Sequence, residues 1–352
     1  MTPSRPLVSV IIPNYNYART LRMCIEAVQA QTYRPIEITV VDDCSTDDSV
    51  AIAESLGVRV SRTPGNGGVA TARNVGAAAA SGEVLLFLDS DIALEPTAVE
   101  RAVERLVADP EAGAVCGVYE PTPLIRDSLV EEYRCLQAHY WRITSEGVVS
   151  FLFPSICAMR AEVLAEIGPF NPRLRQTEEV DYGFRLSRRY GIVLTAAVRG
   201  RHDDDDRLRP LLRKLFVRGR LRVPLYSRMR RFARGFETAS RAWGTLAALA
   251  AVVTVPLPFV LGASWTAVPV LLLLASVVCD RGMYAFVART RGVRFTAGFC
   301  VFQFLVNVAI AGGVACGVAQ WLLSPSFRRL YDPAPADAAE AATISTNAVR
   351  ST

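Results

Sequence analysis

The chain has 352 residues, a formal net charge of +5 and 51% hydrophobic residues. This length accommodates two or three domains, and the mean hydropathy of +0.24 is high for a water-soluble enzyme. The apolar excess is uneven, because residues up to Arg241 have an ordinary globular composition whereas Trp243 to Leu323 are almost continuously apolar. We therefore expect a soluble part followed by a membrane part.

The cysteines and the first residues indicate the compartment. The eight cysteines form no CxxC pair and have no regular spacing, which argues against a zinc site or a disulfide framework and favours a reducing compartment. Residues 1–6 lead into a strand-like run without a hydrophobic leader. We therefore expect no signal peptide, and a cytoplasmic soluble part.

Strand and helix patterns alternate along the first 90 residues. Strands are predicted at 7–12, 36–41, 58–60 and 83–88, with helices at 20–31, 47–56 and 68–80. This alternation predicts an α/β fold whose Rossmann-like, mostly parallel sheet is covered by helices on both faces. Ligands bind at the carboxyl ends of such strands.

Two carboxylates follow the fourth strand. Asp89 and Asp91 are two residues apart, so in an extended chain they point the same way and face one hard cation, such as a divalent metal that bridges two phosphates. The alternative is that Asp89 only caps the next helix.

The segment Gly65 to Ala70 matches the GxGxxA pattern of dinucleotide-binding enzymes. That pattern belongs after the first strand, whereas here two strand–helix units precede it. We expect the glycines to form a tight turn whose backbone N–H groups face an anion instead.

Four motifs together resemble the family 2 glycosyltransferases. They are Val8 to Asn16, Val40 to Asp47 (VVDDCSTD), Gly65 to Asn74 and Leu86 to Asp91. The similarity covers roughly residues 7 to 205 and implies a GT-A fold, a nucleotide-diphosphate sugar donor, Mn²⁺ or Mg²⁺, and inversion at the anomeric carbon.

The resemblance also implies roles for single residues. Positions that match donor contacts are Pro13, Tyr15, Asp42, Asp43, Gly67, Arg73 and Asp89, and those that match metal ligands are Asp89, Asp91 and His202. Cys44 stands where the family often has glycine or another small residue.

The candidate catalytic base lies in residues 176–186. Glu178, Glu179 and Asp181 begin an amphipathic helix, whose N-terminus favours negative charge. Family members commonly have Glu-Asp here, with the second acid as base, so the resemblance assigns this role to Glu179, a longer side chain, beside Glu178. The alternative is that these acids only suit the helix dipole.

His202 follows a strand-like run at 192–198 and precedes four aspartates at 203–206. The family often has a histidine here that completes the metal shell, and imidazole suits Mn²⁺ beside carboxylates. A solvated loop histidine is the alternative. The aspartates are expected to attract metal nonspecifically or to cap the next helix.

The soluble domain is expected at residues 1–206, followed by a basic segment at 207–241. In that segment arginines alternate with leucines at helical spacing, which predicts an amphipathic interfacial helix on anionic lipid. A nucleic-acid-binding stripe is the weaker reading, because the adjacent apolar segments already explain the charge. Some of these arginines would also suit the phosphate of a lipid-linked acceptor.

Residues 242–323 are predicted to form about three transmembrane helices, at 243–260, 264–288 and 296–323. Arginines near them place the catalytic domain on the cytoplasmic side of a multi-pass inner-membrane protein. Gly312-Gly313 offers an alternative, a break that makes the last segment re-entrant. Residues 324–352 are predicted to be a disordered tail.

Together these features predict a membrane-anchored inverting glycosyltransferase, acting on a hydroxyl of a lipid or lipid-linked glycan. The alternative is a polyprenyl-phosphate glycosyl synthase, whose acceptor is a phosphate. A processive synthase is disfavoured because no QxxRW-like motif precedes the apolar segments. An inactive binding protein on the same fold stays open, and no nucleic-acid partner is expected.

Overall fold

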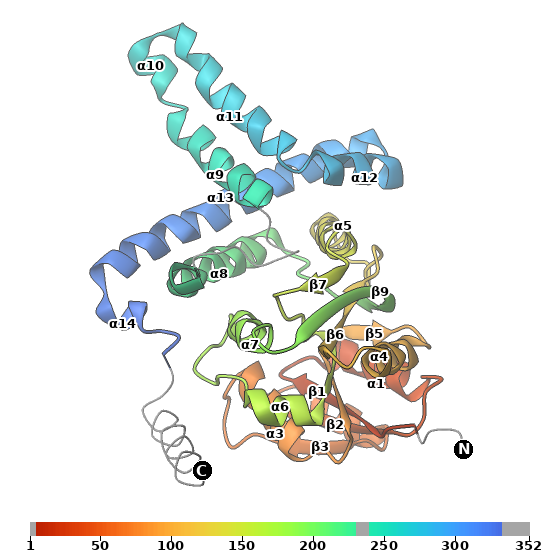
Figure 1. Cartoon of the computed structure of the whole chain (residues 1–352). Coiled ribbons are helices and arrows are strands. Elements are labelled where there is room, and N and C mark those ends of the chain that lie inside the picture. Colours follow the sequence, from red (N-terminus) through yellow and green to blue (C-terminus); the bar gives the residue numbers. More distant parts are fainter. Residues whose placement is uncertain (1–4, 230–238, 333–352) are drawn as a thin grey trace.

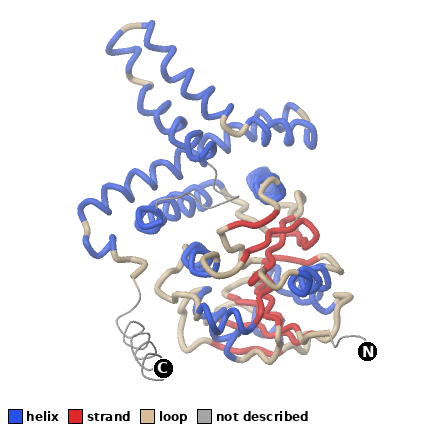
Figure 2. The backbone as a smooth tube through the Cα atoms, in the orientation of Figure 1, coloured by secondary structure: helices blue, strands red, loops and turns tan. Residues whose placement is uncertain are grey.

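The structure is a computed structural model that describes residues 5–229 and 239–332. A nine-stranded sheet lies at the centre of the N-terminal domain, as Figures 1 and 2 show. Its strands are β1 (Val8–Asn14), β2 (Ile36–Asp42), β3 (Arg59–Arg62), β4 (Val84–Leu88), β5 (Ile92–Leu94), β6 (Ala112–Tyr119), β7 (Gly147–Val149), β8 (Ile156–Arg160) and β9 (Gly191–His202). The order is β3-β2-β1-β4-β8-β6-β9-β5, and β7 pairs with β9.

The α/β fold is confirmed, and its sheet is mixed. Strands β3, β2, β1 and β4 are parallel, as predicted. Strand β8 then runs antiparallel to β4 and β6, and β5 and β7 run antiparallel to β9. Because β1 and β2 pair in register from Val8 with Ile36 to Asn14 with Asp42, their carboxyl ends reach one edge of the sheet together.

Helices cover both faces of the sheet. The helices of this domain are α1 (Ala18–Gln29), α2 (Ser49–Ser55), α3 (Val69–Ala78), α4 (Ala98–Ala108), α5 (Leu129–Ile143), α6 (Ala161–Ile167) and α7 (Glu178–Leu186). Side chains of a strand alternate between faces, so Val10 and Ile12 pack with α1 and α4 while Ile11 packs in the cluster that contains residues of α3, α6 and α7. The two apolar clusters, one on each face of the sheet, fix the position of the edge where the carboxyl ends of β1 and β2 lie.

The remaining helices form a second region, on one side of the sheet domain (Figure 1). They are α8 (Leu208–Met229), α9 (Ala239–Thr254), α10 (Leu257–Leu261), the 3₁₀ turn η1 (Ala263–Thr266), α11 (Ala267–Val278), α12 (Arg281–Arg291), α13 (Val293–Leu323) and α14 (Pro325–Arg328). A third apolar cluster, which includes Tyr133 of α5, Leu211 of α8, Met283 of α12 and Phe299 of α13, joins this region to the sheet domain.

The helices of the apolar region differ from the three predicted spans. Among the described residues, only α13 is by itself long and apolar enough to cross a membrane. A second candidate exists only if Ala263–Val278 and α12 are counted as one span, although the chain bends there by 69°. The first predicted span, residues 243–260, is interrupted because α9 ends at Thr254.

Part of the predicted disordered tail is folded. Ser324 caps α14 by accepting a hydrogen bond from the backbone N–H of Phe327. Tyr331 is 6% exposed and its hydroxyl lies 2.8 Å from Thr177 Oγ1 and 2.9 Å from the backbone oxygen of Leu221. Residues 324–332 therefore return to the sheet domain, and the rest of the predicted tail lies outside the described residues.

Candidate active site

The start of α7 is tied to the end of β4 by one arginine. Arg73 of α3 is 2% exposed and donates to Glu178 Oε1 at 2.9 Å and to Asp89 Oδ1 at 2.8 Å. The predicted donor-binding Arg73 thus joins a predicted catalytic acid to the first acid of the DxD pair. Charge-assisted bonds of this kind are strong and directional, so they fix both carboxylates at the sheet edge.

The surroundings of Glu178 change the pKa of its carboxyl group. Burial and the neighbouring Glu179 raise the pKa of Glu178 to about 7, and Arg73 opposes this rise. One of its oxygens, Oε2, is buried without a hydrogen-bond partner. A buried carboxyl oxygen without a hydrogen-bond partner destabilises the folded protein unless a ligand or solvent group reaches it. Glu178 is therefore placed to accept a hydrogen bond from a substrate in addition to pairing with Arg73.

Glu179, the predicted base, faces α8. Its Oε1 lies 3.4 Å from Nη2 of Arg222, whose guanidinium also lies over the ring of Phe151, 5.5 Å from its centroid. The residue is 9% exposed. The basic segment therefore reaches the predicted catalytic acid directly, a connection that the sequence pattern did not indicate.

The side chains of Asp91 and His202, the predicted metal ligands, lie close together. Asp91 Oδ2 is 3.5 Å from His202 Nε2, and Asp204 Oδ2 is 3.5 Å from His202 Nδ1. The imidazole stacks on Tyr119, with ring centroids 4.3 Å apart. Asp204 also pairs with Arg134 at 3.5 Å. Asp204 therefore orients the histidine. This is a more specific role than the helix capping that was expected for the four aspartates.

These groups fit a divalent cation. Asp91 Oδ1 is buried and has no hydrogen-bond partner, and one carboxylate with one imidazole is a donor set that suits Mn²⁺. Asp89 uses Oδ1 to accept from Arg73 instead. Among the residues that the structure describes, no group of three His, Cys, Asp or Glu side chains is arranged to hold a metal. Asp91 and His202 would thus need oxygens of a substrate to complete a coordination shell.

Asp43 accounts for the glycine-rich turn. Its carboxylate accepts hydrogen bonds from Thr63 Oγ1 at 2.7 Å and from the backbone N–H groups of Gly67 and Gly68 at 2.9 and 2.7 Å. The anion that the turn faces is therefore a side chain of the protein itself. Asp42 plays a similar part, because it accepts from the N–H of Ser45.

The loop after β1 lies beside that turn. Pro13 is buried, whereas Tyr15 is 46% exposed. A cavity of about 460 Å³ opens nearby, between the β2 end and α2. Its lining includes Asp42, Cys44, Arg62 and Thr63.

Some site residues were not found by sequence reasoning. The charges of Asp91 and then burial and Asp89 hold the pKa of the Tyr17 hydroxyl above its usual range, so this phenol stays protonated beside the DxD pair. Tyr331 contacts Thr177, the residue just before α7. Tyr17 follows the recognised Tyr15 motif and offered a weak signal, but Tyr331 lies 154 residues from its partner and offered none.

Comparisons with known proteins support the family and the fold. The sequence model described as Glycosyl transferase family 2 matches residues 9–168. Glycosyltransferase GlyG of Streptococcus pneumoniae is 29% identical over 200 residues, covering 51% of this chain and 65% of the relative. An uncharacterized glycosyltransferase of Nostoc is 35% identical over 178 residues, covering 47% of this chain and 54% of the relative. The chain thus matches between half and two thirds of these relatives' lengths.

A solved structure shares the fold over most of the chain. The mannosyltransferase PcManGT from Pyrobaculum calidifontis, in complex with GDP-Man and Mn²⁺, is similar to it with a TM-score of 0.57. The two are 17% identical, and the match covers 88% of each chain. The similarity therefore extends beyond the sheet domain into the helical region.

Proposed function

Because residues 9–168 belong to glycosyl transferase family 2, we propose that the chain is a membrane-attached inverting glycosyltransferase. It transfers a sugar from a nucleotide-diphosphate donor to a hydroxyl of a lipid or lipid-linked glycan. The observation that supports the proposal is the joining of Glu178, the neighbour of Glu179, to Asp89 through Arg73.

The proposed transfer requires a base on the acceptor side. Glu179 takes the proton of the acceptor hydroxyl, whose oxygen attacks the anomeric carbon from the face opposite the phosphate. The bond from that carbon to the phosphate oxygen breaks, and the nucleoside diphosphate leaves with both electrons. The ion pair of Glu179 with Arg222 at 3.4 Å keeps the carboxylate oriented while leaving Oε2 to reach the hydroxyl.

The leaving diphosphate needs positive charge near it. We assign Mn²⁺ or Mg²⁺ to Asp91 and His202, and such a cation acts as a Lewis acid on phosphate oxygens. The Mn²⁺ in the complex of PcManGT supports a divalent metal in this fold. Asp204 and Tyr119 hold the imidazole of His202 in place, and Tyr15, Asp42, Asp43 and Gly67 shape the side that receives the donor.

The acceptor is proposed from the helical region. The apolar helices that follow the sheet domain would hold the active site close to a bilayer, within reach of substrates that are confined to that bilayer. A polyprenyl phosphate is the second candidate acceptor, and the approach of the Arg222 guanidinium to Glu179 favours it, because arginine is well suited to bind phosphate. With that acceptor no hydroxyl proton needs to be removed, so the base matters less.

A substitution of Glu179 tests the proposal. Glu179→Gln should lower the turnover with a hydroxyl acceptor by about 10²- to 10⁴-fold and leave donor binding intact, whereas Asp181→Asn on the same helix should retain activity. Transfer is measured with membranes, a panel of radiolabelled nucleotide sugars and Mn²⁺ or Mg²⁺, followed by identification of the labelled lipid.

The other outcomes are also informative. Asp91→Asn should remove donor hydrolysis that depends on the metal. Full activity of Glu179→Gln on a phosphate-bearing lipid would replace the hydroxyl acceptor by the second candidate. If the purified protein binds and cleaves no nucleotide sugar, with or without metal, the proposed activity is wrong.

A further inference from the structure

The α9–α11 hairpin is the most apolar exposed part of the molecule. We use this name for residues 239–278, which rise away from the other helices and return to them at α12 (Figure 1). No charged residue occurs between Arg241 and Asp280. Its large apolar side chains are exposed to an unusual degree, for example Phe259 at 86%, Val260 at 77%, Val253 at 67% and Leu271 at 63%. Such a continuous apolar surface marks an interaction site.

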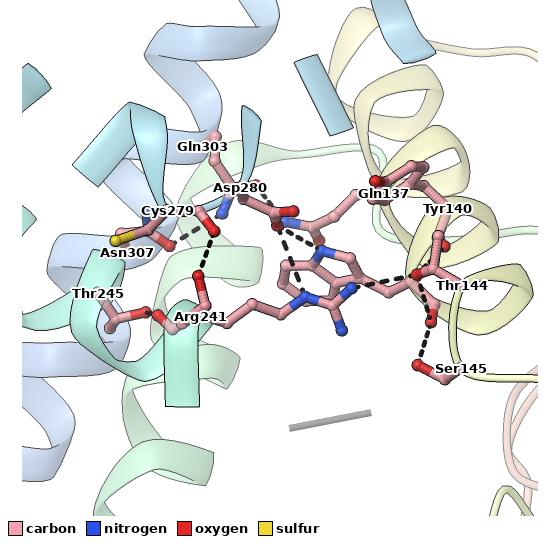
Figure 3. A network of polar contacts seen from close by, with 12 residues as sticks. Gln137, Tyr140, Thr144, Ser145, Arg241, Thr245, Cys279, Asp280, Gln303 and Asn307 are labelled. Carbon is pink, nitrogen blue, oxygen red and sulfur yellow. Dashed lines mark hydrogen bonds and ion pairs between the residues drawn. The ribbon is translucent and has the colours of Figure 1, made fainter. Parts of the chain in front are cut away.

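The base of the hairpin is fixed to the sheet domain. Arg241 and Asp280 pair at 3.6 Å, and the indole of Trp141 on α5 donates to Asp280 Oδ2 at 2.8 Å. Arg241 Nη2 also donates to Thr144 Oγ1 at 3.3 Å. Figure 3 shows this network, with the side chains of α5 meeting those of the helical region. The hairpin therefore begins and ends with charges held at the sheet domain.

No single helix of the hairpin is long enough to cross a bilayer, and the rising arm is broken at Val255-Pro256, between α9 and the five-residue α10. Helix α9 has 16 residues, which makes it about 24 Å long, and the returning arm Ala263–Val278 has about the same length. The hydrocarbon core of a bilayer is about 30 Å thick. Beyond Val278 the chain turns by 69° into α12, so the returning arm is not extended by that helix.

Helix α13 is long enough to cross, but both of its ends are held at the sheet domain. Just before it, Arg291 lies 3.7 Å from Glu132 of α5. Within its first half, Gln303 accepts a hydrogen bond at 2.7 Å from Tyr133, also on α5. Beyond its last residue, Tyr331 contacts Thr177 at 2.8 Å. A helix that spans a bilayer would place its two ends on opposite sides.

Helix α13 also packs along α8, which is rich in arginine. A Cβ atom on Gly313 would lie 2.1 Å from the backbone oxygen of Phe216, and one on Gly219 would lie 2.7 Å from that of Ile310. The two backbones are thus in close contact at several turns. Because α8 carries charged side chains along its length, a helix packed beside it does not lie in the hydrocarbon core.

We propose that the α9–α11 hairpin enters one leaflet of a lipid bilayer and turns back, while α13 lies along the membrane surface without crossing. The acyl chains of lipids cover the exposed apolar side chains of the hairpin. Exposed arginines at its base, Arg281, Arg289 and Arg294, face anionic headgroups. The catalytic domain and residue 332 then lie on the same side of the membrane.

Reporter fusions test this topology without any substitution in the chain. Green fluorescent protein fused after Thr352 should fluoresce in a bacterial host, and alkaline phosphatase at the same place should be inactive. N-terminal fusions serve as controls and should give the same pattern. An active phosphatase after Thr352 would show that α13 crosses the membrane, and would overturn the proposal.

Labelling of the hairpin tip tests its depth. Ser264→Cys should react with a membrane-impermeant maleimide only after detergent is added, relative to the unsubstituted chain. Labelling in intact cells would show that the hairpin crosses twice and would overturn the proposal. Phe259→Asp should lower the protein bound to vesicles of phosphatidylcholine and phosphatidylglycerol, whereas Val107→Asp, at an exposed apolar site on α4 (66%), should not. None of these measurements depends on transferase activity.

Discussion

A single backbone angle explains the unusual residue at position 44. Cys44 has φ of +67°, in the left-handed region that favours glycine, and the family resemblance places glycine or a small residue there. The chain therefore carries strain of about 1 kcal/mol beside Asp43 and the donor side of the site.

We expect Cys44→Gly to relieve this strain and raise the free energy of unfolding by up to about 1 kcal/mol. The gain is limited because glycine also increases the entropy of the unfolded chain. Denaturant unfolding of the two proteins in detergent measures the difference. Gly57→Ala is the matched control: it has φ of +69° and open space around it, so it should lose stability. A large loss in Cys44→Gly would show that the thiol itself is needed.

The residues of the site differ in how well sequence predicts them. Asp89 and Asp91 follow directly from an apolar strand that ends in acids, and β4 confirms that strand. The contacts of Asp89 do not follow, because Arg73 joins it to Glu178, which lies 105 residues after Arg73. Such a contact depends on how α3 and α7 lie across the sheet. Local patterns therefore predict the types of site residue, and tertiary packing decides which of them meet.

At the scale of elements, helix α13 shows the limit of hydropathy. Its sequence is apolar on all sides, which predicted a span, and it is long and apolar enough for one; what hydropathy did not indicate is that one face packs on α5 and α8. Hydropathy measures transfer out of water and does not distinguish lipid from a protein partner. The small residues Gly312, Gly313 and Gly317 were the available signal, since small residues allow helices to approach closely.

The α8–α13 contact provides a test at this scale. Gly313→Ala places a Cβ 2.1 Å from the backbone oxygen of Phe216, so the helices must separate, at a cost of about 1–3 kcal/mol. The shift should also move Arg222 from Glu179 and lower the transfer rate. Thermal unfolding in detergent and a transfer assay measure both effects.

Gly298→Ala on the same helix is the control. A Cβ there meets no atom within 4 Å, so alanine should be neutral or stabilise the helix by up to about 1 kcal/mol. If both variants unfold at the temperature of the unsubstituted protein, α8 and α13 are not packed as described.

For the molecule as a whole, the hairpin and the site are separable. The hairpin leaves and re-enters the helical region at Arg241 and Asp280, whose side chains lie 3.6 Å apart, so a short Gly-Ser linker can replace residues 243–278 without pulling these anchors apart. The contacts of Arg73, Asp91, Glu179 and Tyr331 involve no residue of the removed segment.

We therefore expect the shortened protein to be soluble without detergent and to bind and hydrolyse the donor as the full chain does. Transfer to a water-soluble acceptor analogue should persist, and transfer to an acceptor embedded in vesicles should be lost, because the site is no longer held at the bilayer. Both acceptors are assayed with the same donor. Equal loss with both acceptors would mean that the hairpin supports the folding of the site, whereas undiminished transfer in vesicles would mean that the arginines of α8 and α12 suffice for attachment.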